Sequence, residues 1–113
     1  MASELEQELH AAMLATCRRA VPEIGHAANY LMQVLGEHGG CEAARTMINR
    51  EAPSVPFTAL WKRGRLDLSV EALVVGNSKW HELFEPEELA RARRRLSECG
   101  YGEKKEVSIE PFL

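Results

Sequence analysis

The distribution of glycine and proline between Glu37 and Gly76 constrains the fold of this chain more than any other feature. A helix-closing glycine can take the left-handed conformation, and proline cannot continue a helix because it lacks the backbone N–H. Four such signals interrupt the segment, namely Gly39-Gly40, Pro53 with Pro56, Gly64 and Gly76. The short apolar runs between these signals predict a cluster of short helices.

The composition indicates one ordinary globular domain. The chain has 113 residues, of which 45% are hydrophobic and 27% charged, enough for a single modest core. The net charge of -3 weakens the case for a dedicated nucleic-acid binder. The acidic N-terminus does not resemble a signal peptide, and no apolar run approaches the ~20 residues that span a bilayer. Three widely spaced cysteines (Cys17, Cys41 and Cys99) favour reduced thiols, so we expect a cytoplasmic protein.

Apolar residues recur at spacings of three and four, which predicts an all-α, compact single-domain bundle of about six short helices. We expect this helical domain over residues 1–100 and a C-terminal tail over residues 101–113. Pro22 is expected to end the first helix or open the second, and a short strand at Leu73–Val75 stays open because that run is β-prone. The first and last helices are expected to be the longest and to pack against each other. The predicted helices are Ser3–Ala20, Pro22–Glu37, Cys41–Arg50, Phe57–Arg63, a segment after Ser69, and one opened by Pro86.

Three segments together resemble a small bacterial helical module that has no established activity. They are HGGCEAARTMIN, FTALWKRGRLDLSVEALVV and KWHELFEPEELARARRRL, and the resemblance covers roughly residues 29–96. Because such modules occur alone or appended to larger bacterial proteins, the resemblance implies an interaction or accessory role. The matching positions are Gly39, Gly40, Ala43, Ala44, Phe57, Leu60, Trp61, Arg65, Leu66, Asp67, Leu68, Val70, Glu71, Ala72 and Leu73.

The charged segment from Arg65 to Glu71 is the best candidate for a special site. A structural interpretation has Asp67 or Ser69 capping a helix while Arg65 pairs with a carboxylate, and the strong N-cap preference of Asp and Ser favours it. A functional interpretation has the segment presented to a protein partner. The predicted partner-binding face then gathers Trp61, Arg63, Arg65, Asp67 and Glu71.

A basic surface is the alternative. The run from Arg91 to Arg95 could join the basic residues around Trp61 to bind phosphates, as in a nucleic-acid-associated accessory protein. The competing interpretation is a solvated helix face, with Glu87 paired to Arg91 and Glu98 paired to Arg94, and the acidic overall balance favours it. The residues of the predicted nucleic-acid surface are Lys62, Arg63, Arg65, Arg91, Arg94 and Arg95.

The sequence predicts no catalytic residue, cofactor or metal site. His38 and Cys41 form a single loose pair, whereas a structural zinc site shows two tight pairs of ligands. The aromatic residues are interpreted first as core, with an exposed one beside Arg65 expected to mark a binding hot spot. We therefore predict a non-enzymatic protein-interaction or accessory module, with self-association as an open alternative and no role for a membrane or a small-molecule substrate. The aromatic core candidates are Phe57, Trp61, Trp80 and Phe84.

Overall fold

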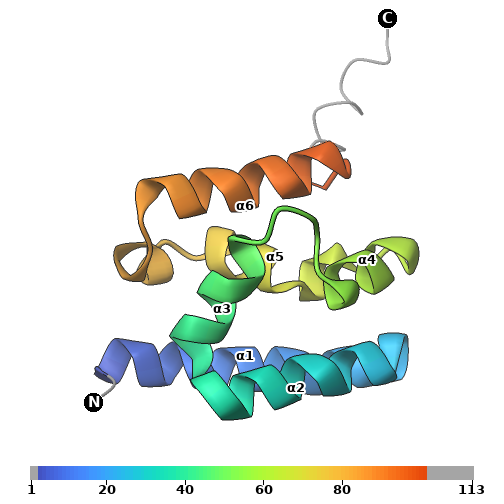
Figure 1. The fold of residues 1–113 in the computed structure, drawn as a ribbon, viewed down its shortest axis with the longest axis horizontal. Coiled ribbons are helices and arrows are strands. Elements are labelled where there is room, and N and C mark those ends of the chain that lie inside the picture. Colours follow the sequence, from blue (N-terminus) through green and yellow to red (C-terminus); the bar gives the residue numbers. More distant parts are fainter. Residues whose placement is uncertain (1–2, 102–113) are drawn as a thin grey trace, which may run out of the picture.

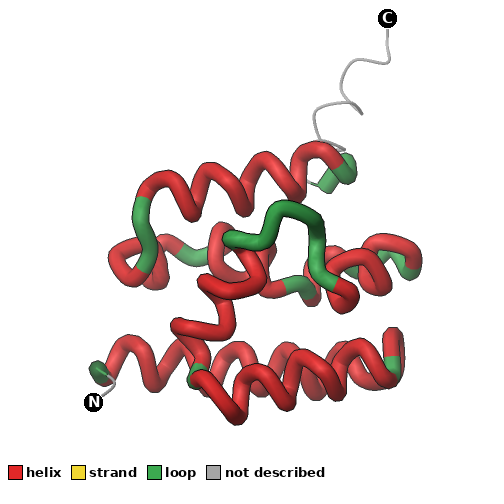
Figure 2. Tube along the Cα trace, viewed as in Figure 1, coloured by secondary structure: helices red, strands yellow, loops and turns green. Residues whose placement is uncertain are grey.

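The computed structural model describes residues 3–101, and over that range the chain is an all-α single-domain bundle without strands (Figures 1 and 2). This confirms the predicted fold class. The predicted tail lies outside the described residues apart from its first residue, Tyr101. The helices are α1 (Glu4–Ile24), α2 (His26–His38), α3 (Gly40–Ile48), α4 (Val55–Lys62), α5 (Val70–Gly76) and α6 (Pro86–Glu98), with two 3-10 helices, η1 (Leu66–Leu68) and η2 (Ser78–Leu83).

The helices form three levels in Figure 1. Helices α1 and α2 lie side by side at one side of the molecule, and α6 lies at the opposite side. Between them lie α4 and α5, and α3 crosses from α2 towards α6. Helix α6 packs mainly on α5, so the prediction that the first and last helices pack against each other is wrong. The buried core fills the spaces between these levels and includes Leu9, Met13, Leu35, Met47, Val74 and Ala92 in one cluster and Ala20, Phe57, Leu60, Leu68 and Leu96 in another.

Side-chain caps mark the starts of α1, α4 and α5. Ser3 and Glu6 form a capping box at the start of α1. The hydroxyl of Ser54 accepts a hydrogen bond from Phe57 N–H over 3.2 Å at the start of α4, and that of Ser69 accepts one from Ala72 N–H over 3.1 Å at the start of α5. These bonds satisfy N–H groups that have no partner within the helix.

One predicted helix boundary is wrong, and the strand that the sequence left open does not form. Helix α1 continues through Pro22 to Ile24, although a proline inside a helix removes one backbone hydrogen bond. The chain instead turns at Gly25, whose φ of 53° lies in the left-handed region, and α2 starts at once. The β-prone run Leu73–Val75 is helical, since it belongs to α5 and Val74 is fully buried there.

Helices α1 and α3 approach each other closely at Gly40. A Cβ atom at this position would lie 2.5 Å from the Cα of His10 and 2.8 Å from its backbone nitrogen. Only a residue without a side chain therefore allows α3 to start against α1. This contact explains physically why the second glycine of the Gly39-Gly40 pair is needed.

Candidate functional site

Trp61 is the largest exposed apolar side chain at the end of α4. It is 49% exposed, whereas Phe57 and Leu60 of the same helix are buried. The prediction that Trp61 belongs to the core is therefore wrong, while the same prediction is confirmed for Phe57, Trp80 and Phe84. A helix of eight residues has one face against the core, and Trp61 lies on the other.

A hollow of about 380 Å³ lies beside Trp61. We call it the Trp61 groove. Two glycines with positive φ, Gly64 at 71° and Gly100 at 81°, end α4 and α6 there and turn the chain tightly. Tyr101, 39% exposed, brings a second aromatic side chain to the groove. The lining residues are Trp61, Gly64, Leu66, Asp67, Cys99, Gly100 and Tyr101.

Ion pairs order the polar edge of the groove. Arg65 donates to Asp67 from Nε over 3.0 Å and from Nη2 over 3.1 Å, a two-point contact, and from Nη1 to Oε2 of Glu23 over 3.0 Å. Arg63 donates to the other oxygen of Glu23 over 3.4 Å. The hydrogen bond from Arg65 holds the pKa of Asp67 below its ordinary value, against the opposing effect of burial. The structural interpretation of the segment is thus confirmed for Arg65, with Ser69 rather than Asp67 as the cap.

Glu71 does not belong to the predicted partner-binding face. Its side chain is 1% exposed and accepts a hydrogen bond from Arg95, so the prediction that it is presented to a partner is wrong. Burial raises the pKa of Glu71, although bonds from its own backbone and from Arg95 act to lower it. From the sequence, Glu71 is only a charged residue in the first turn of a predicted helix. In the structure, this first turn of α5 packs against α6, which buries the side chain. The exposed part of the predicted face is Trp61, Arg63, Arg65 and Asp67.

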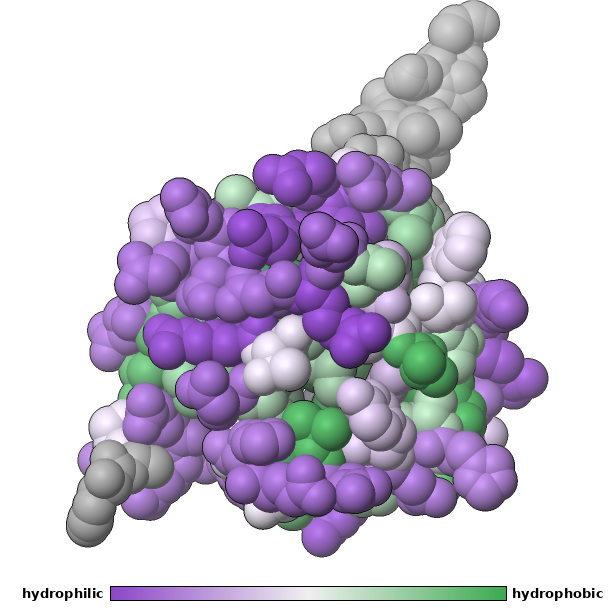
Figure 3. Space-filling model, in the orientation of Figure 1, coloured by the Kyte–Doolittle hydropathy of each residue, from purple (hydrophilic) through white to green (hydrophobic). Residues whose placement is uncertain are grey.

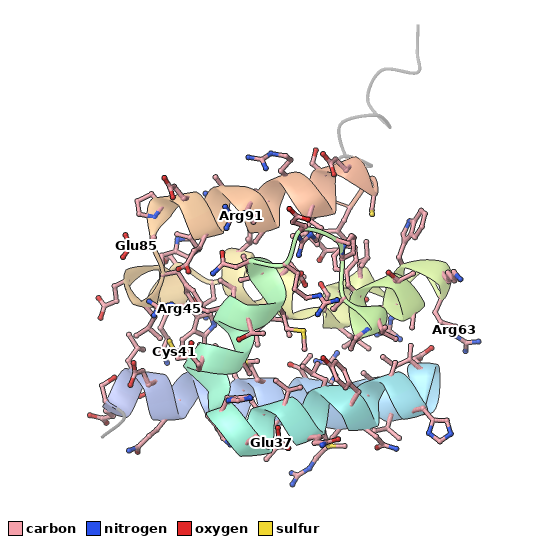
Figure 4. All side chains as sticks on the ribbon, in the orientation of Figure 1. Glu37, Cys41, Arg45, Arg63, Glu85 and Arg91 are labelled. Carbon is pink, nitrogen blue, oxygen red and sulfur yellow. The ribbon has the colours of Figure 1, made fainter. Side chains whose placement is uncertain are left out.

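The predicted nucleic-acid surface does not form one face either. Arg95 is buried, and Arg63 and Arg65 are paired with carboxylates. Figure 4 shows Arg63 at the end of α4 and Arg91 on α6, well apart. Lys62 and Arg94 are exposed on those two separate helices. The six residues therefore divide into a group at and after the end of α4, in which Arg63 and Arg65 are paired, and a group along α6.

Burial makes the three cysteine thiols less acidic than a free thiol. Burial raises the pKa of Cys17 to about 11 and also raises the pKa of Cys41 and Cys99. An activated thiol nucleophile needs the opposite shift. His38 and Cys41 do line one hollow of about 430 Å³ between α1 and α3, but within residues 3–101 no three His, Cys, Asp or Glu residues are arranged to hold a metal ion.

Comparisons with protein-family models, with curated proteins and with solved structures found no match. The resemblance to a small bacterial helical module therefore stays a prediction. Across the described helices, none combines the length and apolarity needed to cross a membrane.

Sequence reasoning missed three participants in the groove and its edge: Glu23, Cys99 and Tyr101. Glu23 is 42 residues from Arg65 in sequence, so no local pattern could pair them. A signal for Tyr101 did exist, since an aromatic residue directly after a helix-ending glycine is placed by that turn. Tyr101 N–H bonds back to the carbonyl of Leu96 over 3.0 Å, which holds it at the end of α6.

Proposed function

We propose that this chain is a non-enzymatic protein-interaction module whose contact surface is the Trp61 groove. The observation that carries the proposal is the half-exposed indole of Trp61 on the edge of a hollow that Tyr101 also lines. Tryptophan and tyrosine dominate binding hot spots because they bury a large area at low entropic cost.

The surroundings of Trp61 match the anatomy of a binding surface. Buried Leu66 contributes an apolar wall to the groove, and the network of Glu23, Arg63, Arg65 and Asp67 forms a polar rim. Interfaces combine an apolar centre with a polar rim in this way. Because Arg65 is already held by two carboxylates, a partner that binds it loses little side-chain entropy. We further propose that the chain is a bacterial accessory protein that acts in the cytoplasm.

A capture experiment with a matched control tests the proposal. The tagged chain is used to isolate partners from the source organism, beside the variants Trp61→Ala and Val55→Ala. Val55 is the control because it lies on the same helix, is 65% exposed and does not line the groove. Partners retained by the Val55 variant and lost by the Trp61 variant, with unchanged circular dichroism, support the proposal. Equal retention by both variants contradicts it.

A second copy of the chain is one candidate partner. Analytical ultracentrifugation over a range of concentrations then shows a monomer–dimer equilibrium for the natural chain. The Trp61→Ala variant is expected to shift this equilibrium towards the monomer by at least about thirtyfold, which corresponds to the smallest effect of a hot-spot residue, about 2 kcal/mol. A natural chain that stays monomeric directs the search to a different protein.

A further inference from the structure

Two hollows of opposite character meet at Arg50, in the segment between α3 and α4. One has a volume of about 330 Å³ and is lined by arginines from this segment and from α6, namely Arg50, Arg91, Arg94 and Arg95. The other has a volume of about 290 Å³ and is largely apolar, with Ala27 and Tyr30 from α2 and Val55 from the start of α4. Arg50 lines both hollows, so the two are adjacent.

The arginine hollow combines a fixed floor with uncommitted guanidinium groups. Arg95 forms the floor and is fully engaged with Glu71 and with the carbonyls of Met47 and Arg50. Within residues 3–101, Arg91 donates only to the neutral amide of Asn49. The exposed guanidinium groups of Arg50 and Arg94 make no ion pair or hydrogen bond with the residues that the structure describes. This holds for Arg94 even though Glu98 follows one helical turn later, so the predicted pair between them is not formed.

The apolar hollow lies next to the guanidinium groups of the arginine hollow and presents apolar side chains to a ligand. Tyr30 is 43% exposed and Val55 is among the most exposed apolar side chains described. Figure 3 shows this face of the molecule, where hydrophilic side chains cover α6 and the preceding loop, and a hydrophobic patch lies beside them near the start of α4. An aromatic ring of a ligand can pack against Tyr30 by offset stacking or an edge-to-face contact.

We propose that this composite surface binds a free nucleotide. Its phosphate is held by Arg50, Arg91 and Arg94, since guanidinium groups match phosphate oxygens in two-point, charge-assisted hydrogen bonds. Its base lies on Tyr30 and Val55. This binding site is separate from the Trp61 groove and does not depend on the proposed interaction function.

A free nucleotide fits better than a nucleic-acid strand. Glu51 and Glu98 also line the arginine hollow, and the chain carries a net charge of -3. A long polyanion depends on an extended basic surface to displace its counterions, and the two acidic side chains interrupt such a surface here. A single phosphate group needs only the few arginines that surround the hollow.

Isothermal titration with adenosine monophosphate tests the site, with adenosine, inorganic phosphate and a short single-stranded oligonucleotide as the other ligands. We expect a Kd below about 1 mM for the nucleotide and weaker binding of both adenosine and phosphate, because each of these occupies one hollow only. The absence of nucleotide binding at that concentration overturns the proposal. Binding of the oligonucleotide without binding of the nucleotide also overturns it, in favour of a nucleic-acid surface.

Matched variants distinguish binding at a defined site from nonspecific attraction of the nucleotide to positive charge. Arg94→Gln and Arg50→Gln are expected to weaken nucleotide binding about tenfold each, the usual effect of losing one hydrogen bond to a charged group. Arg93→Gln removes the same charge from an exposed neighbour on α6 that does not line the hollow, and its affinity is expected to stay unchanged. Tyr30→Ala is expected to weaken the nucleotide but not inorganic phosphate. An equal loss in the Arg93 and Arg94 variants contradicts a defined site.

Discussion

Arg95 donates a hydrogen bond from Nη1 to Oε2 of Glu71 over 3.2 Å, and both side chains are buried between α5 and α6. The same guanidinium also donates to the carbonyl oxygens of Met47 over 3.0 Å and of Arg50 over 2.6 Å. These carbonyls belong to the end of α3 and the residues after it, where backbone acceptors lack a helical partner. One side chain of α6 therefore joins α5 to the end of α3.

Loss of Arg95 is expected to be among the most costly substitutions on α6. In Arg95→Ala, Glu71 stays buried without its cationic partner, which costs about 3–5 kcal/mol of unfolding free energy. Arg93→Ala, on the exposed side of the same helix, is expected to change stability by less than about 0.5 kcal/mol. Urea unfolding followed by circular dichroism measures both. Similar losses for the two variants would show that the buried pair has no special role.

Two glycines one turn apart are expected to respond in opposite directions to alanine. Gly40→Ala places a Cβ 2.5 Å from the Cα of His10 and forces α1 and α3 apart, at a cost of about 1–3 kcal/mol. Gly36 lies inside α2 with nothing within 4 Å of an added Cβ, so Gly36→Ala is expected to stabilise the chain by about 0.5–1 kcal/mol. Thermal unfolding compares the two. A stable Gly40→Ala variant would disprove the close contact between α1 and α3.

The two tryptophans are expected to differ in solvent accessibility and in their contribution to the free energy of unfolding. Trp61 is half exposed, while Trp80 is 4% exposed, so acrylamide should quench the fluorescence of Trp61 far more strongly. Comparing Trp61→Phe with Trp80→Phe separates the two emissions. Trp80→Ala is expected to cost about 3–5 kcal/mol of stability as a buried aromatic deletion, and Trp61→Ala much less. Equal quenching in the two phenylalanine variants would place Trp61 in the core.

Stability is expected to depend on pH through Asp67. Its folded pKa lies below the ordinary value of 3.8, so its contribution is fully present above that pH and is lost as the pH falls through the folded pKa. The natural chain should therefore be more stable than Asp67→Asn at neutral pH, and the difference should shrink in acid. Urea unfolding at a series of pH values measures this difference. High salt should reduce it, because Asp67 and Arg65 are only partly covered. A difference that is independent of pH argues against the pair.

The thiols are expected to report on the Trp61 groove. Cys17 is 1% exposed with a pKa of about 11, so a disulfide reagent at about pH 8 should not modify it while the chain is folded. Cys99 lines the groove and should react first, and Cys99→Ser should remove this phase. A partner bound in the groove should slow the reaction of Cys99 but leave the half-buried Cys41 unaffected. Modification of Cys17 at the rate of Cys99 would contradict the buried position of Cys17.

Local interactions in the sequence were sufficient to predict the all-α class and the Ser69 cap. Both depend on residues within a few positions of one another. The same local rules predicted a helix boundary at Pro22, yet α1 continues through it to Ile24 and the chain turns at Gly25.

At Trp61 and Glu71, the tertiary structure decided which side chain faces the core. Trp61 is half exposed and Glu71 is buried, the reverse of what their side-chain chemistry predicts, because α4 ends at the surface and the first turn of α5 lies beneath α6. The ion pairs that order these positions join Arg65 to Glu23 across 42 residues and Arg95 to Glu71 across 24. Helical periodicity extends over a few turns of one helix, so it determines where helices form, whereas contacts between distant segments determine which side chains meet and which remain available to a partner.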